Sequence, residues 1–129
     1  MRVEISRCVV ELIQRAAAKA APLEACGLLF GDAHAILEAE ACANVAEDPA
    51  ARFEIDPAAL IAALRAERAG GRQVVGYWHS HPSGTARPSA TDVAMAQPDG
   101  KLWLIAGGGD LTAWRAMPPG LEQVTIELR

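Results

Sequence analysis

Apolar residues recur along the chain with two periods, and these periods predict helices and short strands in turn. A first helix is expected from Ser6, which suits the N-cap position, to about Ala20. The apolar face of this helix would consist of Val9, Leu12, Ile13, Ala16 and Ala20. A second helix is expected over 58–69, because Asp56 can cap it and Pro57 suits its first turn. The buried stripe of the second helix would consist of Leu60, Ile61 and Leu64.

The other apolar runs are short, and residues that favour turns bound them, so they are predicted to be strands. Gly31-Asp32 suits a hairpin turn between two of them. The glycine run 107–109 lies between two further strands and precedes no helix, so it is interpreted as a turn and not as a phosphate-binding loop. A short helix is expected over 89–97. The predicted strands cover residues 2–5, 23–30, 33–42, 73–79, 102–106, 111–115 and 123–128, with a brief extended segment at 52–55.

The order of these elements predicts the fold class. The predicted order is strand, helix, two strands, helix, strand, helix and three strands. This order lacks the strict alternation of strands and helices that a doubly wound parallel sheet requires. The expected fold is therefore α+β, with a mixed, curved sheet, two longer helices and one short helix. The chain has 129 residues, of which 51% are hydrophobic, which is enough for one core. We expect a single domain over residues 1–129.

Charge and cysteine content narrow the possible functions. The net charge of -4 argues against a protein that binds nucleic acid, which would present a basic patch. No apolar run approaches the ~18–20 residues of a membrane span and no signal peptide is recognisable, so no membrane association is expected. Cys8, Cys26 and Cys42 are odd in number and lack C-x-x-C spacing, which favours reduced thiols and a cytoplasmic location.

The segment from His79 to Asp92 carries the candidate chemistry. Alternate residues of a strand point to one face, so His79 and His81, at the end of an apolar strand, would direct two imidazoles towards one point. Asp92 follows across a loop and could complete a three-ligand zinc site, which in catalytic centres keeps its fourth position open for water. Two structural alternatives stay open at this point: the histidines could brace a loop, and Ser89 with Asp92 fits a helix capping box.

The spacing of these residues resembles the signature of a known family. H-S-H-P at 79–82, followed by S-x-x-D at 89–92, is similar to the motif of the JAMM metalloproteases, the active MPN-domain family. That motif expects a glutamate upstream, at the start of an apolar strand, where this chain has Glu24. The segment F-E-I-D-P at 53–57 is similar to one found in short bacterial members. The resemblance covers most of the chain, from the first helix to the second hairpin, and implies an MPN-like fold.

The resemblance implies a role for each matched residue. One Zn2+ per chain would be bound by His79, His81 and Asp92, and would lower the pKa of a water molecule from ~15.7 towards 7. Glu24 would act first as general base and then as general acid, and partial burial would raise its pKa towards the working range. The Ser89 hydroxyl could donate a hydrogen bond to the oxyanion. Without the resemblance, Glu24 would be interpreted as an ordinary exposed acid.

The activity implied by the resemblance is hydrolysis of a peptide or isopeptide bond at the C-terminal tail of a small ubiquitin-like or sulfur-carrier protein. Two alternatives have other sequence requirements. A non-catalytic MPN-type interaction scaffold usually lacks one or more of the matched residues. A zinc deaminase of nucleobases needs H-x-E with a downstream P-C-x-x-C, and this chain has neither.

The remaining side chains with possible chemistry have structural interpretations. Cys26 shares a strand face with Glu24 and could lie near the metal, but packing in the core is the favoured interpretation. His34, near a hairpin turn, is expected on the surface. Core positions are expected for Trp78, Trp103 and Trp114.

Overall fold

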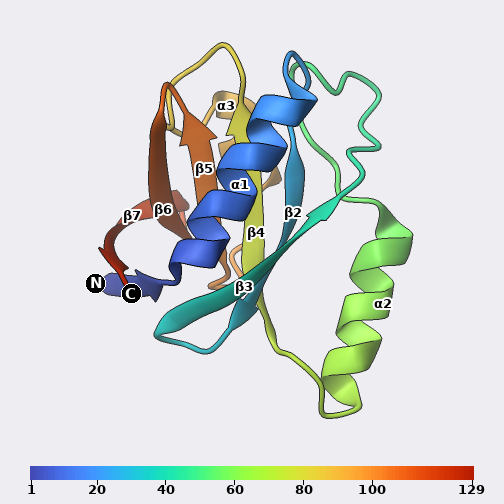
Figure 1. Cartoon of the computed structure of the whole chain (residues 1–129), viewed down its shortest axis with the longest axis vertical. Coiled ribbons are helices and arrows are strands. Elements are labelled where there is room, and N and C mark those ends of the chain that lie inside the picture. Colours follow the sequence, from blue (N-terminus) through green and yellow to red (C-terminus); the bar gives the residue numbers. More distant parts are fainter.

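The computed structural model describes residues 1–129, and its elements follow the order predicted from the sequence (Figure 1). The first and last strands pair with each other, so the two ends of the chain are neighbours (Figure 1). In chain order the elements are β1 (Arg2–Ile5), α1 (Arg7–Ala20), β2 (Cys26–Gly31), β3 (Ala35–Cys42), α2 (Pro57–Arg68), β4 (Val74–His81), α3 (Ala90–Met95), β5 (Leu102–Gly107), β6 (Asp110–Met117) and β7 (Gly120–Leu128).

The strands form one sheet that closes on itself in the order β1-β3-β2-β4-β5-β6-β7. β1 pairs in parallel with β3 and β7, and β4 pairs in parallel with β5, whereas the other neighbours are antiparallel. The predicted mixed, curved sheet is therefore confirmed. Closure depends on the pairing of β1 with β7, which joins the two ends of the chain. The local apolar pattern of the sequence does not predict this pairing.

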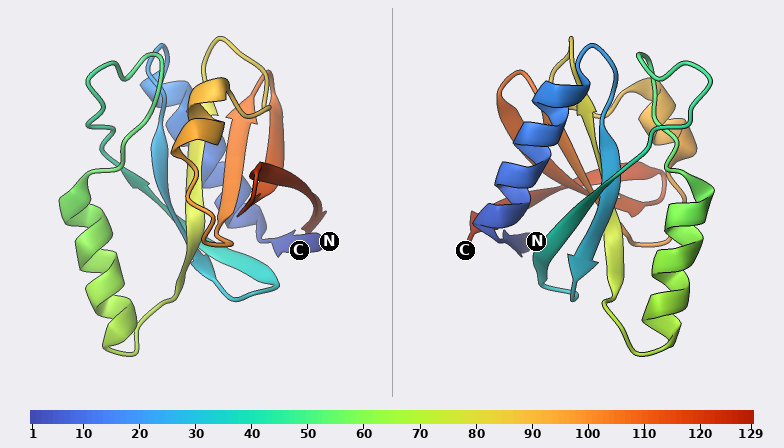
Figure 2. Two further views of the ribbon diagram at one scale, coloured as in Figure 1. Left: turned by 180° about the vertical axis from the view of Figure 1, so that it is seen from behind. Right: turned by 45° about the vertical axis from the view of Figure 1, so that its right-hand side comes forward.

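α1 lies across one face of the sheet and covers the first apolar cluster (Figures 1 and 2). Val9 and Ile13 of α1 are completely buried, and the other members of its predicted apolar face pack against the same cluster. Ser6 occupies the N-cap position, but its hydroxyl donates to the carbonyl oxygen of Leu37 at 2.9 Å and makes no capping hydrogen bond. The expected helix and its buried face are confirmed, while Ser6 ties the helix to β3.

The opposite face of the sheet carries the second apolar cluster, which α2, α3 and the segment between β3 and α2 surround (Figure 2). Asp56 caps α2 as predicted, since its side chain accepts a hydrogen bond from the Ala58 amide at 3.0 Å. α2 has no fully buried residue, and Ile61, expected in its buried stripe, is 48% exposed. That prediction is wrong because α2 contacts the cluster only through the side that carries Leu60 and Leu64. None of the helices has the length and apolar character that a bilayer span requires.

Several element boundaries differ from the prediction, and the differences fall around the candidate site. β2 begins at Cys26, three residues later than expected, because the backbone before it bonds to side chains and to a loop instead of to a neighbouring strand. β4 continues to His81, so both histidines of the motif lie on the strand. The segment 52–55 makes a single bridge, between Asn44 and Ile55, and α3 is shorter than expected.

Gly27 makes room for a buried hydrogen bond between the strands. It lies opposite Trp78 in the pairing of β2 with β4, and the Trp78 indole N–H donates to the Glu40 carbonyl oxygen at 3.0 Å. A Cβ atom at Gly27 would lie 1.8 Å from that oxygen and 2.4 Å from the Trp78 indole nitrogen. Only glycine at this position lets the fully buried indole reach its acceptor.

We therefore expect Gly27→Ala to lower the free energy of unfolding by roughly 3 kcal/mol or more, the upper end of the usual cost of overpacking a core. Gly84→Ala is the control, because a Cβ there would meet no atom closer than 3.4 Å. Urea unfolding followed by tryptophan fluorescence measures both. Equal stability of the two variants would show that the sheet adjusts to the added methyl group.

Candidate metal centre

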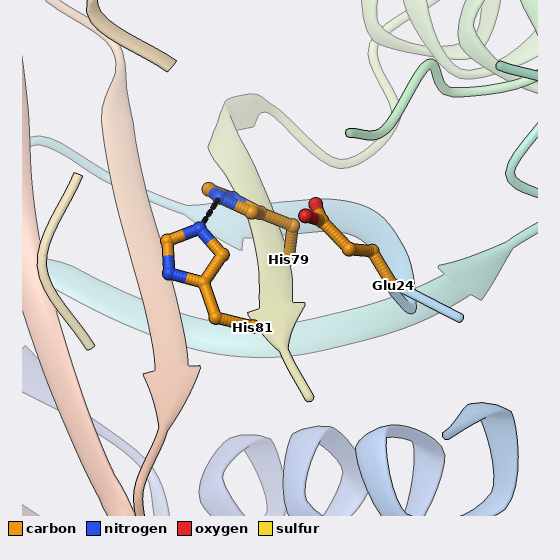
Figure 3. A group of neighbouring side chains, drawn as sticks. All are labelled: Glu24, His79 and His81. Carbon is orange, nitrogen blue, oxygen red and sulfur yellow. Dashed lines mark hydrogen bonds between the residues drawn. The ribbon is translucent and has the colours of Figure 1, made fainter. Parts of the chain in front are cut away.

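The residues singled out in the sequence meet beside the C-terminal end of β4, on the face of the second apolar cluster. His79 and His81 project from that strand, and Glu24 approaches from the segment just before β2 (Figure 3). One ligand atom from each of these three residues lies within 4.8 Å of the other two. Asp92, on α3, reaches the same two imidazoles from the other side of the loop 82–89. The structure thus brings together all four residues of the predicted constellation.

Three side-chain atoms form a nearly equilateral triangle. The Nε2 atoms of His79 and His81 are 3.1 Å apart, and Asp92 Oδ2 lies 3.0 Å from each of them. Ligands at 2.0 Å from a tetrahedral zinc ion would be separated by about 3.3 Å, so the triangle needs to widen only slightly to hold one. Two imidazole nitrogens and a carboxylate oxygen are also the ligand types that zinc accepts.

The imidazole of His81 is oriented by the loop that follows β4. Its Nδ1 lies 2.8 Å from the carbonyl oxygen of Thr85, an acceptor that fixes the proton on Nδ1 and leaves the Nε2 lone pair free. A backbone carbonyl bound to the second ring nitrogen is the usual support of a histidine that binds a metal. The geometry of His81 is therefore that of a preformed ligand.

The imidazole of His79 is held by aromatic packing. The ring is completely buried and stacks on Phe53, with the centroids 4.3 Å apart and the planes at 20°. Trp103 meets it edge-on at a centroid distance of 5.7 Å. Its Nδ1 is buried and has no hydrogen-bond partner, so packing, and not a second hydrogen bond, fixes this ring.

Asp92 is both a helix cap and a member of the triangle. Its Oδ2 accepts a hydrogen bond from the Ser89 amide at 2.9 Å, and the Ser89 hydroxyl accepts one from the Asp92 amide at 3.0 Å. The capping box considered in the sequence is therefore present, and the same carboxylate oxygen also faces both histidines. The two interpretations of Asp92 are compatible, because one carboxylate oxygen has two lone pairs.

The protonation preferences of the triangle follow from burial and from its hydrogen bonds. Burial lowers the pKa of His79 and keeps its imidazole neutral, which is the form that binds metals. The hydrogen bond with Asp92 raises the pKa of His81. Burial acts to raise the pKa of Asp92, but its hydrogen bonds with His79 and His81 outweigh burial and hold that pKa well below its ordinary value. Metal binding would therefore compete with a proton on His81.

Glu24 is buried beside the triangle without joining it. The side chain is 6% exposed, and its Oε1 is buried without a hydrogen-bond partner. Burial raises its pKa from 4.5 to about 7; the nearby His81 opposes the rise and Asp92 adds to it. An unpartnered carboxyl group that titrates near neutrality is suited to general acid–base chemistry.

Ser89 keeps a free hydroxyl proton. Its oxygen accepts the Asp92 amide hydrogen bond at 3.0 Å, and a hydroxyl can accept and donate at the same time. The capping box fixes this hydroxyl beside Asp92, at the edge of the triangle. The geometry of Ser89 permits its hydroxyl to donate to an oxyanion, and that role stays a prediction.

The structure also assigns the side chains that lie outside the centre. Cys26 is 1% exposed and packs in the second apolar cluster, as expected, and burial, Cys42 and Glu24 raise its pKa to about 12. His34 is exposed on the turn between β2 and β3. The three tryptophans are buried in the two clusters as predicted.

Two supporting residues were missed in the sequence. Phe53, which stacks on His79, was noted only within the F-E-I-D-P segment, and no periodicity points from it to the histidine. Asn44 was assigned to a polar loop, yet its side chain makes five hydrogen bonds to backbone groups around Glu24 and the loop that follows. An asparagine that opens the loop soon after a strand is the one signal that could have indicated such a role.

The family described as prokaryotic homologs of the JAB domain matches residues 6–117 of the chain, which include Glu24, the two histidines, Ser89 and Asp92.

Three curated relatives are also similar in sequence. The desampylase of Haloferax volcanii is 39% identical over 95 residues, which cover 71% of this chain and 68% of that protein. The desampylase of Pyrococcus furiosus is 32% identical, with 71% of this chain and 66% of that protein covered. A probable TtuB-protein conjugate cleaving protease of Thermus thermophilus is 32% identical, with 66% and 56% covered. The matched segment thus spans between about half and two thirds of each relative.

Solved structures share the fold. A protein of Desulfitobacterium hafniense is 27% identical with a TM-score of 0.84, over 98% of this chain and 92% of that one. A JAB1/MPN domain protein of Archaeoglobus fulgidus is 25% identical with a TM-score of 0.67, over 99% and 98%. A structure described as a JAMM metalloprotease-like zinc site is 23% identical with a TM-score of 0.64, over 100% and 99%, and supports the fold alone.

The triangle predicts that the purified protein binds about one zinc ion per chain. Asp92→Asn removes the charge of the third ligand but keeps an acceptor for the Ser89 amide, so α3 keeps its cap. We expect zinc affinity to fall by at least the roughly 10–100-fold that loss of a supporting contact costs. Competition with a chromophoric chelator measures the affinity. Glu24→Gln is the control and should bind zinc as the wild type does; equal affinity in Asp92→Asn would exclude Asp92 as a ligand.

The raised pKa of Glu24 predicts a pH-dependent stability in protein stripped of metal. The pKa in the folded state, about 7, lies above the ordinary value of 4.5, so the wild type loses stability as the pH rises from 4.5 to 7. Glu24→Gln does not titrate at this position. The difference in unfolding free energy between variant and wild type should therefore grow in favour of the variant by at most about 3 kcal/mol between pH 4.5 and pH 8.

Urea unfolding in the presence of a chelator, at pH 4.5 and at pH 8, measures that difference. Glu47→Gln is the matched control, because Glu47 is an exposed acid in the neighbouring loop. A difference that stays constant with pH would show that Glu24 is not held in a site that disfavours its charge.

Proposed function

Because the chain belongs to the prokaryotic homologs of the JAB domain, we propose that this JAMM-type isopeptidase uses a zinc ion to hydrolyse the bond at the C-terminal tail of a ubiquitin-like or sulfur-carrier protein. The observation that carries the proposal is the triangle of two imidazole nitrogens and one carboxylate oxygen, 3.0–3.1 Å apart, with a buried and unpartnered carboxyl group beside it. Three ligands with a neighbouring acid–base group are what a hydrolytic zinc site needs.

The relatives support the substrate class. Two are named desampylases, and the third is named as a probable protease that cleaves conjugates between TtuB and proteins. A bond between the tail of a small protein modifier and an amine of its target is the shared chemistry. We propose the same class of substrate for this chain, including additions to the C-terminus of a sulfur carrier.

The residues of the site have different roles in hydrolysis. Bound to His79, His81 and Asp92, zinc would supply a Lewis acid that polarises the scissile carbonyl and lowers the pKa of water. Glu24 takes a proton from the attacking water while the oxygen of that water bonds to the carbonyl carbon. When the carbon–nitrogen bond breaks, Glu24 returns that proton to the departing amine. A pKa near 7 allows one group to perform both transfers at neutral pH.

Ser89 and the aromatic residues complete the proposal. The free hydroxyl proton of Ser89 is available to the oxygen that becomes negatively charged as water attacks, and one such donor is typically worth ~3 kcal/mol. Phe53 and Trp103 keep the His79 imidazole at a fixed angle and exclude water from its buried side. A preorganised site of this kind loses little energy to rearrangement during the reaction.

The alternative function, a non-catalytic interaction scaffold, explains fewer features of the structure than the hydrolase does. A scaffold has no need of Glu24, whose buried carboxyl group makes no hydrogen bond through Oε1 and so costs stability. We also keep the cytoplasm as the proposed location, consistent with the three free cysteines.

We expect the zinc-loaded chain to cleave at least one member of a panel of ubiquitin-like and sulfur-carrier proteins extended beyond a C-terminal Gly-Gly. Glu24→Gln should lower turnover by roughly 100- to 10,000-fold, the usual cost of losing a general acid–base group, while zinc stays bound. Intact mass spectrometry identifies the product and the cleaved bond.

Glu47→Gln is again the control and should cleave at the wild-type rate. Full activity in Glu24→Gln would refute the acid–base role. Failure of the zinc-loaded wild type to cleave any panel member would remove the proposed substrate class.

A further inference from the structure

The peptide group that joins Glu24 to Ala25 is held at both ends by side chains. At one end, the Asn44 side-chain amide donates to the Glu24 carbonyl oxygen at 3.0 Å. At the other end, the Ala25 amide donates to the Ser80 hydroxyl oxygen at 2.9 Å. The carbonyl and the N–H belong to the same rigid plane, so two hydrogen bonds from opposite sides fix its orientation.

Backbone hydrogen bonds extend this arrangement to the neighbouring groups. The Glu24 amide donates to the Pro49 carbonyl oxygen at 2.8 Å, and the Ser80 amide donates to the Ala25 carbonyl oxygen at 3.0 Å. β2 begins only at Cys26, so a regular ladder does not orient this peptide. Side chains and a loop replace the ladder at the position where the candidate acid–base residue leaves the backbone.

Ser80 can perform this task because of its place on β4. It lies between the two histidines and points to the opposite face of the sheet, where it is 2% exposed and pairs across the sheet with Ala106 of the first cluster. The middle residue of H-S-H therefore lies on the strand that carries both imidazoles, yet it contacts the segment that carries Glu24. β4 thus sets the distance between the histidines and the carboxyl group.

We propose that Ser80 and Asn44 are positioning residues of the hydrolytic site, which fix the Glu24 carboxyl group relative to the two histidines by holding the Glu24–Ala25 peptide from both sides. The inference rests on the proposed function and adds to it a role for two residues that touch neither metal nor substrate. Loss of either hydrogen bond lets the peptide turn and moves the carboxyl group away from the water it must deprotonate.

Ser80→Ala removes one of the two hydrogen bonds and leaves every ligand atom in place. We expect turnover to fall roughly 10–100-fold, the effect of a misplacement of about 1 Å, with unchanged zinc affinity and unchanged KM. Ser80→Thr restores the hydroxyl group and should restore turnover; Ser80 is among the residues that line a cavity of about 370 Å³. Asn44→Asp keeps the side-chain oxygen that accepts from the Ala46 and Glu54 amides but removes the donor to the Glu24 carbonyl oxygen, and should lower turnover in the same way.

Ser6→Ala is the matched control. Ser6 also makes a side-chain hydrogen bond to a backbone group, here with the Leu37 carbonyl oxygen at 2.9 Å, but it lies at the start of α1, away from the site. Its turnover should equal that of the wild type. Turnover of Ser80→Ala within about threefold of Ser6→Ala, or a loss of turnover that Ser80→Thr fails to restore, overturns the proposal. A loss of zinc affinity in Ser80→Ala also overturns the proposal, because Ser80 would then support the metal ligands and not Glu24.

A second measurement is independent of cleavage. Carbon-13 NMR of the Glu24 carboxyl carbon, in chelated protein, follows its titration directly. In Ser80→Ala the released side chain gains water, and its titration midpoint should shift towards the ordinary value for glutamate; in Ser6→Ala it should stay at the wild-type value. An unchanged midpoint in Ser80→Ala overturns the positioning role even if no substrate is cleaved, whereas a shifted midpoint without cleavage contradicts only the proposed function.

Discussion

Successive side chains of β4 point to opposite faces of the sheet, and the whole site depends on that alternation. The odd-numbered residues His79 and His81 face the second apolar cluster, and the even-numbered Trp78 and Ser80 face α1. Trp78 anchors the strand in the core through its indole hydrogen bond to β3, and Ser80 bonds to the backbone beside Glu24. One short strand therefore carries the two histidines of the candidate metal centre, a core anchor and the link to the backbone beside Glu24. A shift of one residue in its pairing would exchange these faces and remove every one of these functions.

Burial gives the site its chemical character, and it also costs stability. Glu24, His79 and Asp92 are almost inaccessible to water, and ionised groups in such surroundings are stable only when they are paired or bound to a metal. Asp92 is paired with two histidines and an amide, whereas Glu24 has an unpartnered oxygen and a raised pKa. Neighbouring carboxyl groups thus have opposite protonation preferences, which is the difference that the proposed roles of Asp92 as ligand and Glu24 as acid–base group require.

The sequence predicted the order of the elements and the four residues that lie together beside β4, and the predictions that failed did so for local reasons. The histidine spacing was sufficient because strand periodicity makes residues two apart share a face, whatever the tertiary fold. Glu24 could be selected only through the family resemblance, since its neighbours in space come from β4 and from α3. The late start of β2 and the exposure of Ile61 were not predictable, because the first depends on Asn44 and Ser80 and the second on how α2 meets the sheet. Closure of the sheet also depends on contacts between distant parts of the chain.

The double use of Asp92 links occupancy of the centre to local folding. α3 has six residues, too few to be stable alone, and its capping box shares a carboxylate oxygen with the triangle of ligands. The loop 82–89 and α3 consequently behave as one cooperative unit whose opening must also break the contacts of Asp92 with both imidazoles. By mass action, any ion that binds the closed form raises the free energy of opening this unit as its concentration rises above its dissociation constant. With Asp92 as the proposed third ligand, the order of this part of the surface becomes a function of metal supply.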